Sequence, residues 1–130
     1  EHKVYFIEGG YQQVIDTIRF AKDETVPGDI MVLCPTFLVA EQFYNQLPVD
    51  IQEIFEVTNE IITGRNLIST FHAGKGLESK QVILVDAHTI LDRKTFYVAI
   101  TRGIEKLYIH AETFRHEGLV GKFKLLSEQK

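Results

Sequence analysis

The chain has 130 residues, of which 45% are hydrophobic and 25% charged, and its formal net charge at pH 7 is −4. This length predicts one domain with a sizeable core, and the negative charge argues against an autonomous nucleic-acid-binding module, because such modules carry a basic excess. Its one cysteine, Cys34, excludes a disulfide within the chain and argues against a cysteine-rich metal site.

No apolar run approaches the roughly 20 residues that a membrane-crossing helix needs, and no signal-peptide pattern occurs at the start. We therefore expect a cytoplasmic protein without a membrane partner, associated with the nucleoid when it is bound to DNA. The chain begins at Glu1, and its only methionine is Met31. We expect residues 1–130 to be a single domain of a longer protein.

The first half of the chain alternates predicted strands with predicted helices. An apolar run at residues 4–7 before a glycine pair predicts a strand, and helical spacing of apolar residues predicts a helix over residues 11–22. Residues 29–34 predict a second strand, followed by a Pro-Thr turn that can cap a helix. That helix carries an apolar stripe and ends before Pro48; the stripe consists of Ala40, Phe43, Tyr44 and Leu47.

The second half continues the alternation after residues 51–57, which predict either a strand or an irregular connection. Apolar runs rich in β-branched residues predict three strands, at residues 66–71, 81–86 and 106–111. Between the last two strands, residues 93–101 predict a helix that presents Phe96, Tyr97 and Ile100 to the sheet. A closing helix presents Leu119, Phe123 and Leu126.

Almost continuously apolar strands that alternate with helices predict an α/β domain of three layers with a mainly parallel sheet. In such sheets, binding groups gather beyond the carboxyl ends of the strands. Residues 72–75 and residues 86–88 both follow predicted strands. Basic residues are also concentrated in this region, because residues 1–60 hold 3 Lys/Arg against 11 Asp/Glu, whereas residues 61–106 hold 7 against 4.

Lys75 lies between Gly74 and Gly76 in a turn that can offer backbone N–H groups and an ammonium to an anion. The alternative is a plain glycine turn with a solvated lysine. The turn is not a P-loop, because nothing in the chain matches G-x-x-x-x-G-K-[ST]. Tight binding of a nucleoside triphosphate by this chain alone is therefore not expected.

Three blocks of sequence together resemble one known family. The blocks are Thr70-Phe71-His72-Ala73-Gly74-Lys75-Gly76-Leu77-Glu78, then Val82-Ile83-Leu84-Val85, then Tyr97-Val98-Ala99-Ile100-Thr101-Arg102 with Leu107-Tyr108-Ile109 behind. In order, spacing and residue type they resemble the carboxyl-terminal motor domain of UvrD/Rep-type superfamily 1 DNA helicases. The resemblance implies a second RecA-like domain, of the P-loop NTPase-like fold, that lacks a P-loop of its own.

The resemblance also implies a nucleotide site. ATP with Mg²⁺ would be bound jointly with a first RecA-like domain, absent from this chain, which carries the P-loop and the magnesium-binding acid. Arg102 would be the catalytic arginine finger, and Glu78 would accept a hydrogen bond from the ribose, with Lys75 and Gly76 beside the nucleotide. From the residues alone, Arg102 could instead form an ion pair with Asp86 or Glu105, and Glu78 could be a helix first-turn acid.

For nucleic acid, the resemblance implies that Thr70 and His72 contact the backbone of single-stranded DNA, with Lys75 supporting the same loop. A hydroxyl, an imidazole and backbone amides can hold phosphates without distinguishing base sequence. RNA in place of DNA is not excluded by the residues. The alternative for a solitary histidine at a strand end is a local hydrogen bond.

The chain departs from the family pattern at three places. Cys34-Pro35 stands where many relatives carry an aromatic residue and an arginine that reach ATP, although Thr36 could still supply a cap or a polar contact. Ser79 replaces a common aromatic residue, and Gly103 replaces a common alanine. A degenerate, non-catalytic RecA-like interaction module is therefore the second hypothesis. The third hypothesis, an independent small-molecule enzyme, is not supported, because the sequence shows no nucleophile with a base at a recognisable spacing.

Overall fold

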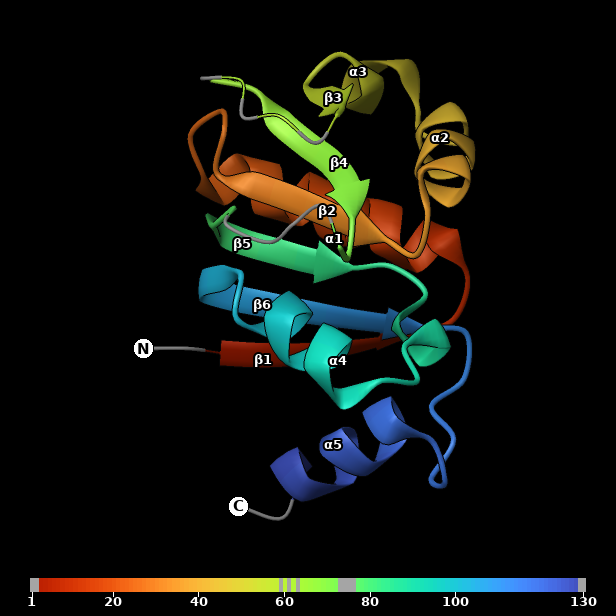
Figure 1. The fold of residues 1–130 in the computed structure, drawn as a ribbon. Helices are drawn as coiled ribbons and strands as arrows, with labels where there is room; N and C mark the ends of the chain where they lie inside the picture. The colour runs from red at the N-terminus through yellow and green to blue at the C-terminus, as the bar shows by residue number, and fades with distance from the viewer. Residues whose placement is uncertain (1–2, 59, 61, 63, 73–76, 129–130) are drawn as a thin grey trace.

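The computed structural model describes residues 3–58, 60, 62, 64–72 and 77–128. In this part of the chain, a six-stranded sheet lies between two layers of helices (Figure 1). The strands are β1 (Lys3–Glu8), β2 (Ile30–Cys34), β3 (Phe55–Val57), β4 (Asn66–Thr70), β5 (Ser79–Leu84) and β6 (Gly103–Ala111). Their order is β1-β6-β5-β2-β4-β3 and every pair is parallel, which confirms the predicted three-layer α/β architecture.

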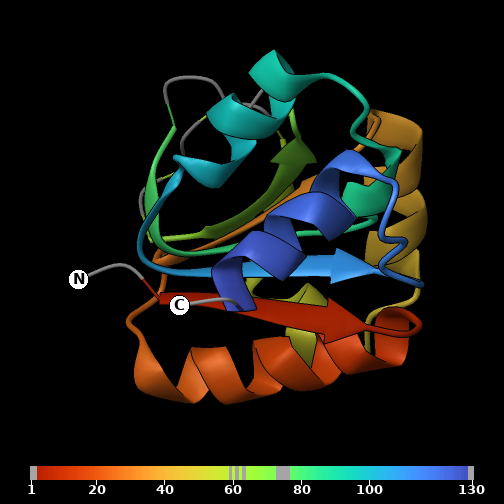
Figure 2. The same cartoon turned by 90° about the horizontal axis from the view of Figure 1, so that it is seen from below.

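The helices divide between the two faces of the sheet. They are α1 (Tyr11–Glu24), α2 (Phe37–Asn45), α3 (Val49–Gln52), α4 (Arg93–Ile100) and α5 (Leu119–Glu128), with a short 3₁₀ helix η1 (Ala87–Thr89). Figure 2 shows α1 on one face and α4 with α5 on the other. No helix in the described ranges is long and apolar enough to cross a membrane.

The core consists of two clusters because side chains alternate across the sheet. In β2, which is buried along its whole length, Val32 and Cys34 pack with α1 and α2, while Met31 and Leu33 pack with α4. Burial raises the pKa of the Cys34 thiol well above its ordinary value. Cys34 is therefore a free, buried thiol that stays protonated in the core.

Side-chain caps begin two of the helices. The Thr36 hydroxyl accepts a hydrogen bond from the Val39 N–H at 3.1 Å, so the predicted cap after Pro35 is confirmed. Asp92 caps α4 by accepting from the Thr95 N–H at 2.8 Å and from the Thr95 hydroxyl at 2.6 Å. Each cap fixes where the chain turns back from a strand onto the sheet.

Two expectations about helix faces were wrong, and the structure decides the alternative left open for residues 51–57. Residues 51–52 belong to the short helix α3, and only residues 55–57 of the predicted strand pair with β4. Tyr97 is 67% exposed, because α4 turns Phe96 and Ala99 toward the sheet instead. Leu126 is 66% exposed, whereas Leu119 and Phe123 of the same predicted stripe pack against the core.

Candidate functional site

The residues that the sequence singled out lie at the two edges of the sheet where its strands begin and end. Because β4 and β5 are parallel, β4 ends at one edge of the sheet and β5 begins at the opposite edge. Residues 71–72 therefore lie at the carboxyl edge, and residues 77–78 lie at the amino edge. Phe71 and Leu77 are both buried in the core cluster that also contains Phe96 of α4.

Helix α4 covers the face on which Phe71 and Leu77 pack, and it runs from the carboxyl edge of the sheet to the amino edge. It follows the carboxyl end of β5 and leads into the amino end of β6. Its first turn lies beside His72, where Lys94, Thr95 and Val98 line a surface pocket with Phe71 and His72. Its last turn lies beside Leu77, whose carbonyl oxygen is 3.4 Å from Nη1 of Arg102.

Arg102 is half-buried at the amino edge, held by oxygen atoms of the chain itself. Its Nε donates to the Val98 carbonyl at 3.0 Å, Nη1 donates to the Leu77 carbonyl at 3.4 Å, and Nη2 donates to the Thr101 hydroxyl at 2.9 Å. Within the described ranges it forms no ion pair, so the alternative pairing with Asp86 or Glu105 is not found. These contacts tie the end of α4 to the residue before Glu78.

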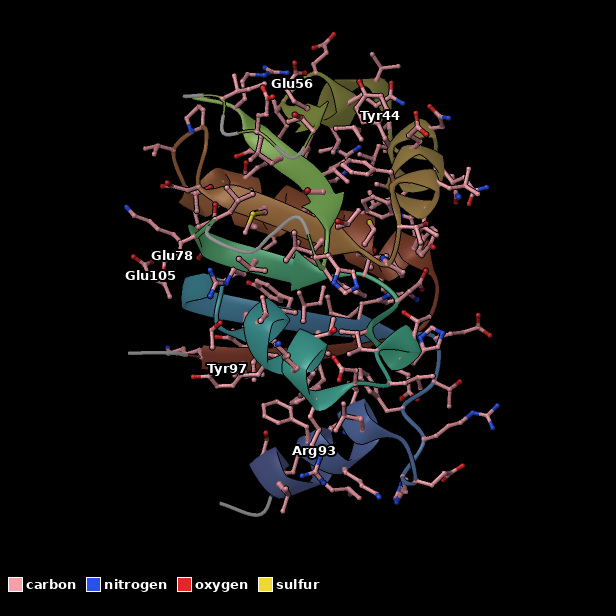
Figure 3. All side chains as sticks on the ribbon, viewed as in Figure 1. Tyr44, Glu56, Glu78, Arg93, Tyr97 and Glu105 are labelled. Atoms are coloured by element: carbon pink, nitrogen blue, oxygen red, sulfur yellow. The ribbon has the colours of Figure 1, made fainter. Side chains whose placement is uncertain are left out.

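Glu78 is exposed and directly precedes β5. It is not part of a helix, so the alternative of a helix first-turn acid is wrong. Figure 3 shows Glu78 at the edge of the sheet where β5 and β6 begin, near Glu105. The Ser79 N–H donates to the Arg102 carbonyl at 3.1 Å, which brings the strand start after Glu78 against Arg102.

The length of the strands separates Glu78 and Arg102 from the predicted nucleic-acid contacts. Thr70 is the last residue of β4 and only 7% exposed, whereas His72 beyond it is exposed. At roughly 3.3 Å per residue, the length of β4 puts the two sets on the order of 15 Å apart along the strand. Lys75 and Gly76, predicted to lie beside the nucleotide, are outside the described residues.

No role was assigned to Lys94 from the sequence alone. The pocket that Lys94 and His72 share has a volume of about 320 Å³. One signal was present in the sequence: residues 94, 98 and 102 recur at a spacing of four, which places Lys94, Val98 and Arg102 on one side of a helix. Lys94 thus lies in the first turn of α4, and Arg102 follows the end of the helix by two residues.

A separate polar cluster lies at the carboxyl edge. Asp86 adopts a left-handed backbone conformation with φ 55°, and its carboxylate accepts from the Tyr11 hydroxyl at 2.5 Å. His110 is buried, with Nδ1 accepting from the Asp86 N–H at 3.0 Å and Nε2 donating to the Gly9 carbonyl at 2.8 Å. Burial lowers the pKa of His110, so the neutral imidazole fits these contacts.

This cluster joins β6 to the segments after β1 and β5 by hydrogen bonds. No group of three or more His, Cys, Asp or Glu side chains in the described ranges is arranged to hold a metal ion. Asp86 contacts Tyr11 and His110. His88 itself is exposed.

The departures from the family pattern lie at both edges. Pro35 and Thr36 follow β2 at the carboxyl edge, away from Arg102. Gly103 lies at the amino edge, where a Cβ would come within 2.9 Å of the Lys106 carbonyl oxygen. Alanine would therefore require the backbone to shift, which explains glycine at this position.

Comparison with known proteins gave a structural match but no match by sequence. No family model matches the chain, and no curated protein matches it. A solved structure of the C-terminal domain of a possible DNA helicase from Lactobacillus plantarum WCFS1 superposes with a TM-score of 0.66 at 17% identity. The match covers 84% of this chain and 72% of that one, and it supports a RecA-like fold for the parallel sheet described above.

Proposed function

We propose that this chain is the second RecA-like motor domain of an ATP-dependent DNA helicase or translocase of the UvrD/Rep type. The single observation that carries the proposal is the joining of Arg102 to the residues around Glu78 at one edge of the sheet. A guanidinium and an exposed carboxylate at the same edge of the sheet suit a nucleotide, whose phosphates accept hydrogen bonds and whose ribose hydroxyls donate them. The shared fold with a possible helicase domain agrees with this function.

The proposed site needs a second domain. This chain lacks the P-loop motif, so a first RecA-like domain would bind most of the ATP and its Mg²⁺. Arg102 would donate to phosphate oxygens when the two domains close, exchanging its present acceptors, Leu77 and Thr101, for the nucleotide. When bound, the nucleotide with its metal supplies the phosphoryl group whose transfer an arginine finger accelerates.

The chain's own residues then have separate tasks. Glu78 accepts a hydrogen bond from the ribose, and Lys75 with Gly76 support the loop beside the nucleotide. His72 contacts the backbone of single-stranded DNA at the carboxyl edge, while Thr70 lies beneath it at the end of β4. Helix α4 touches both ends of this path, so movement of Arg102 toward the nucleotide is mechanically linked to the first turn beside His72.

The proposal is tested by replacing Arg102 in the full-length protein that contains this chain. We expect Arg102→Ala to lower DNA-stimulated ATP turnover by about 10³- to 10⁵-fold, as for other arginine fingers, without loss of single-strand binding. Arg102→Lys keeps the charge but lacks the planar fork, so its turnover should also fall. The measurement is steady-state phosphate release with and without an oligonucleotide.

Arg115→Ala is the matched control, because Arg115 is an exposed arginine in the loop after β6. Since Arg102 also bonds the chain internally, the thermal midpoint of each variant is recorded to separate misfolding from lost catalysis. Normal turnover in a folded Arg102→Ala protein would exclude the finger role.

A non-catalytic interaction module is the second candidate. Two observations favour it. Pro35 stands where many relatives carry an arginine, so one loop lacks that cation. Arg102 already has three hydrogen-bond acceptors within the chain. This candidate expects Arg102→Ala to leave partner binding unchanged, and it expects no DNA-stimulated ATP hydrolysis from the full-length protein.

A further inference from the structure

The outward face of α4 carries an exposed aromatic ring among cations. Tyr97 is 67% exposed, and Arg93 and Lys94 are exposed one turn before it. Residues three and four apart on a helix are neighbours on its surface, so both cations flank the tyrosine. Figure 3 shows Tyr97 and Arg93 on α4, the helix that covers this face of the sheet.

These cations are not neutralised within the described part of the chain. Neither Arg93 nor Lys94 forms an ion pair there, whereas Lys80, Lys106 and Lys124 each do. The acid nearest in sequence, Asp92, is engaged as the cap of α4, and its hydrogen bonds to Thr95 hold its pKa below the ordinary value. The face therefore offers positive charge, and Asp92 is the one carboxylate within the described residues 91–100.

The same face adjoins His72. Lys94 lines one wall of the pocket at the carboxyl edge, and His72 with Phe71 lines another. A polyanion that contacts His72 would therefore pass Lys94 directly and Tyr97 one turn later. Alternating cations and exposed aromatic rings is the arrangement on which single-stranded nucleic acids bind, with phosphates on the cations and bases stacked on the rings.

We propose that α4 extends the single-strand contact beyond His72, with Lys94 binding a phosphate and the Tyr97 ring stacking on a base. This inference rests on the proposed function, because it assigns the next contacts of the same strand. Phosphate binding by Lys94 carries no base preference. Stacking on Tyr97 tolerates any base, because every base presents a π-face.

The experiment measures binding of fluorescently labelled oligo(dT) to the full-length protein over a series of salt concentrations. Tyr97→Ala should weaken binding by roughly 5- to 150-fold, the range for loss of one stacked base, and Tyr97→Phe should bind normally. Lys94→Ala should also weaken binding, and it should reduce the slope of log K against log salt by about 0.7, the value for one phosphate on a single strand.

An oligonucleotide with abasic sites separates the two contacts. On that strand, Tyr97→Ala should bind as the wild type does, because no base is left to stack, while the effect of Lys94→Ala persists. Lys122→Ala and Leu126→Ala are matched controls, since both residues are exposed on α5, and neither should change binding.

Two results would overturn this inference while leaving the proposed function intact. One is that neither Tyr97→Ala nor Lys94→Ala changes single-strand binding or ATP turnover. The other is normal single-strand binding with lower ATP turnover even without DNA in Tyr97→Ala, which would assign the face to a protein domain. A wild-type protein that binds no single strand and hydrolyses no ATP would overturn the proposed function and this inference together.

Discussion

The Arg102 side chain bonds to its own chain and can still exchange some of these bonds for bonds to a phosphate. Its guanidinium donates to Val98, Leu77 and Thr101, yet the last two bonds are a long contact to a carbonyl at 3.4 Å and a contact to a neutral hydroxyl. Charge-assisted bonds to phosphate are stronger than bonds to neutral oxygens. The present contacts therefore orient the guanidinium without holding it as firmly as an ion pair would.

His110 should make the stability of the fold depend on pH. Its pKa is lowered chiefly by burial, against the opposing effects of the Gly9 carbonyl and the Asp86 carboxylate. As the pH falls below about 6.5, the unfolded chain gains a proton at this histidine that the folded chain does not, so the free energy of unfolding falls by up to about 1.4 kcal/mol per pH unit. The loss stops once the pH passes below the folded-state pKa.

Urea unfolding of the wild type and of His110→Gln between pH 5 and pH 7.5 measures this effect. The difference in unfolding free energy between the two proteins should shrink as the pH falls, because glutamine does not titrate. Parallel pH profiles would show that His110 does not titrate differently in the folded and unfolded chain.

At the scale of elements, the position of α5 depends on a close approach between its backbone at Gly121 and the backbone at Arg115. A Cβ on Gly121 would lie 1.7 Å from the Arg115 carbonyl oxygen, so the helix can pack only with glycine there. Gly118 offers a contrast, because its Cβ would lie at an ordinary 3.5 Å from the same oxygen. The loop after β6 therefore fixes the position of α5 against the sheet.

Gly121→Ala should destabilise the protein, although alanine is favoured over glycine in a helix by about 1 kcal/mol. Forcing a methyl group into a filled space costs about 1–3 kcal/mol, here against backbone that cannot rotate away. The midpoint of urea unfolding checks this expectation, with Gly118→Ala as the control of small effect. A Gly121→Ala protein as stable as the wild type would mean that α5 tolerates a shift.

At the scale of the whole molecule, the two halves of the chain differ in charge and in task. The acidic residues are concentrated before residue 60, and the segment from residue 61 to residue 106 carries the basic excess together with His72, Glu78 and Arg102. That segment forms β4 and β5, which lie on either side of β2 in the sheet, and α4, which covers one face of it (Figure 1). The first half supplies α1 and α2, which cover the opposite face.

The chain by itself should hydrolyse no ATP, because a triphosphate needs the backbone amides and lysine of a P-loop, which this sequence lacks. Phosphate release from the purified 130-residue chain should equal the background, with or without single-stranded DNA. Supplying the P-loop domain, on the same polypeptide or as a separate one, should raise turnover in an Arg102-dependent way. Hydrolysis by the chain alone would require a nucleotide site other than the one proposed.

The parallel α/β architecture was predictable because it depends on local patterns. Buried strands such as residues 29–34 are continuously apolar, and helices repeat their apolar residues at a period of 3.6, so each element is visible without its neighbours. The Thr36 cap was predictable for the same reason, since a cap bonds only a few residues along the chain. The resemblance at residues 70–78 also rests on residue type and spacing, and the roles that it implies remain predictions.

The arrangement of the site was not visible in those patterns, because it depends on contacts between residues distant in sequence. The bond from Arg102 to Leu77 spans 25 positions, and the shared pocket of His72 and Lys94 follows from the packing of α4 beside the end of β4. The wrong expectation for Tyr97 has the same cause: both sides of α4 carry apolar residues, and only docking onto the sheet selected Phe96 and Ala99 for burial. Local periodicity thus specifies the elements, whereas their packing determines which side chains meet and which remain free for a partner.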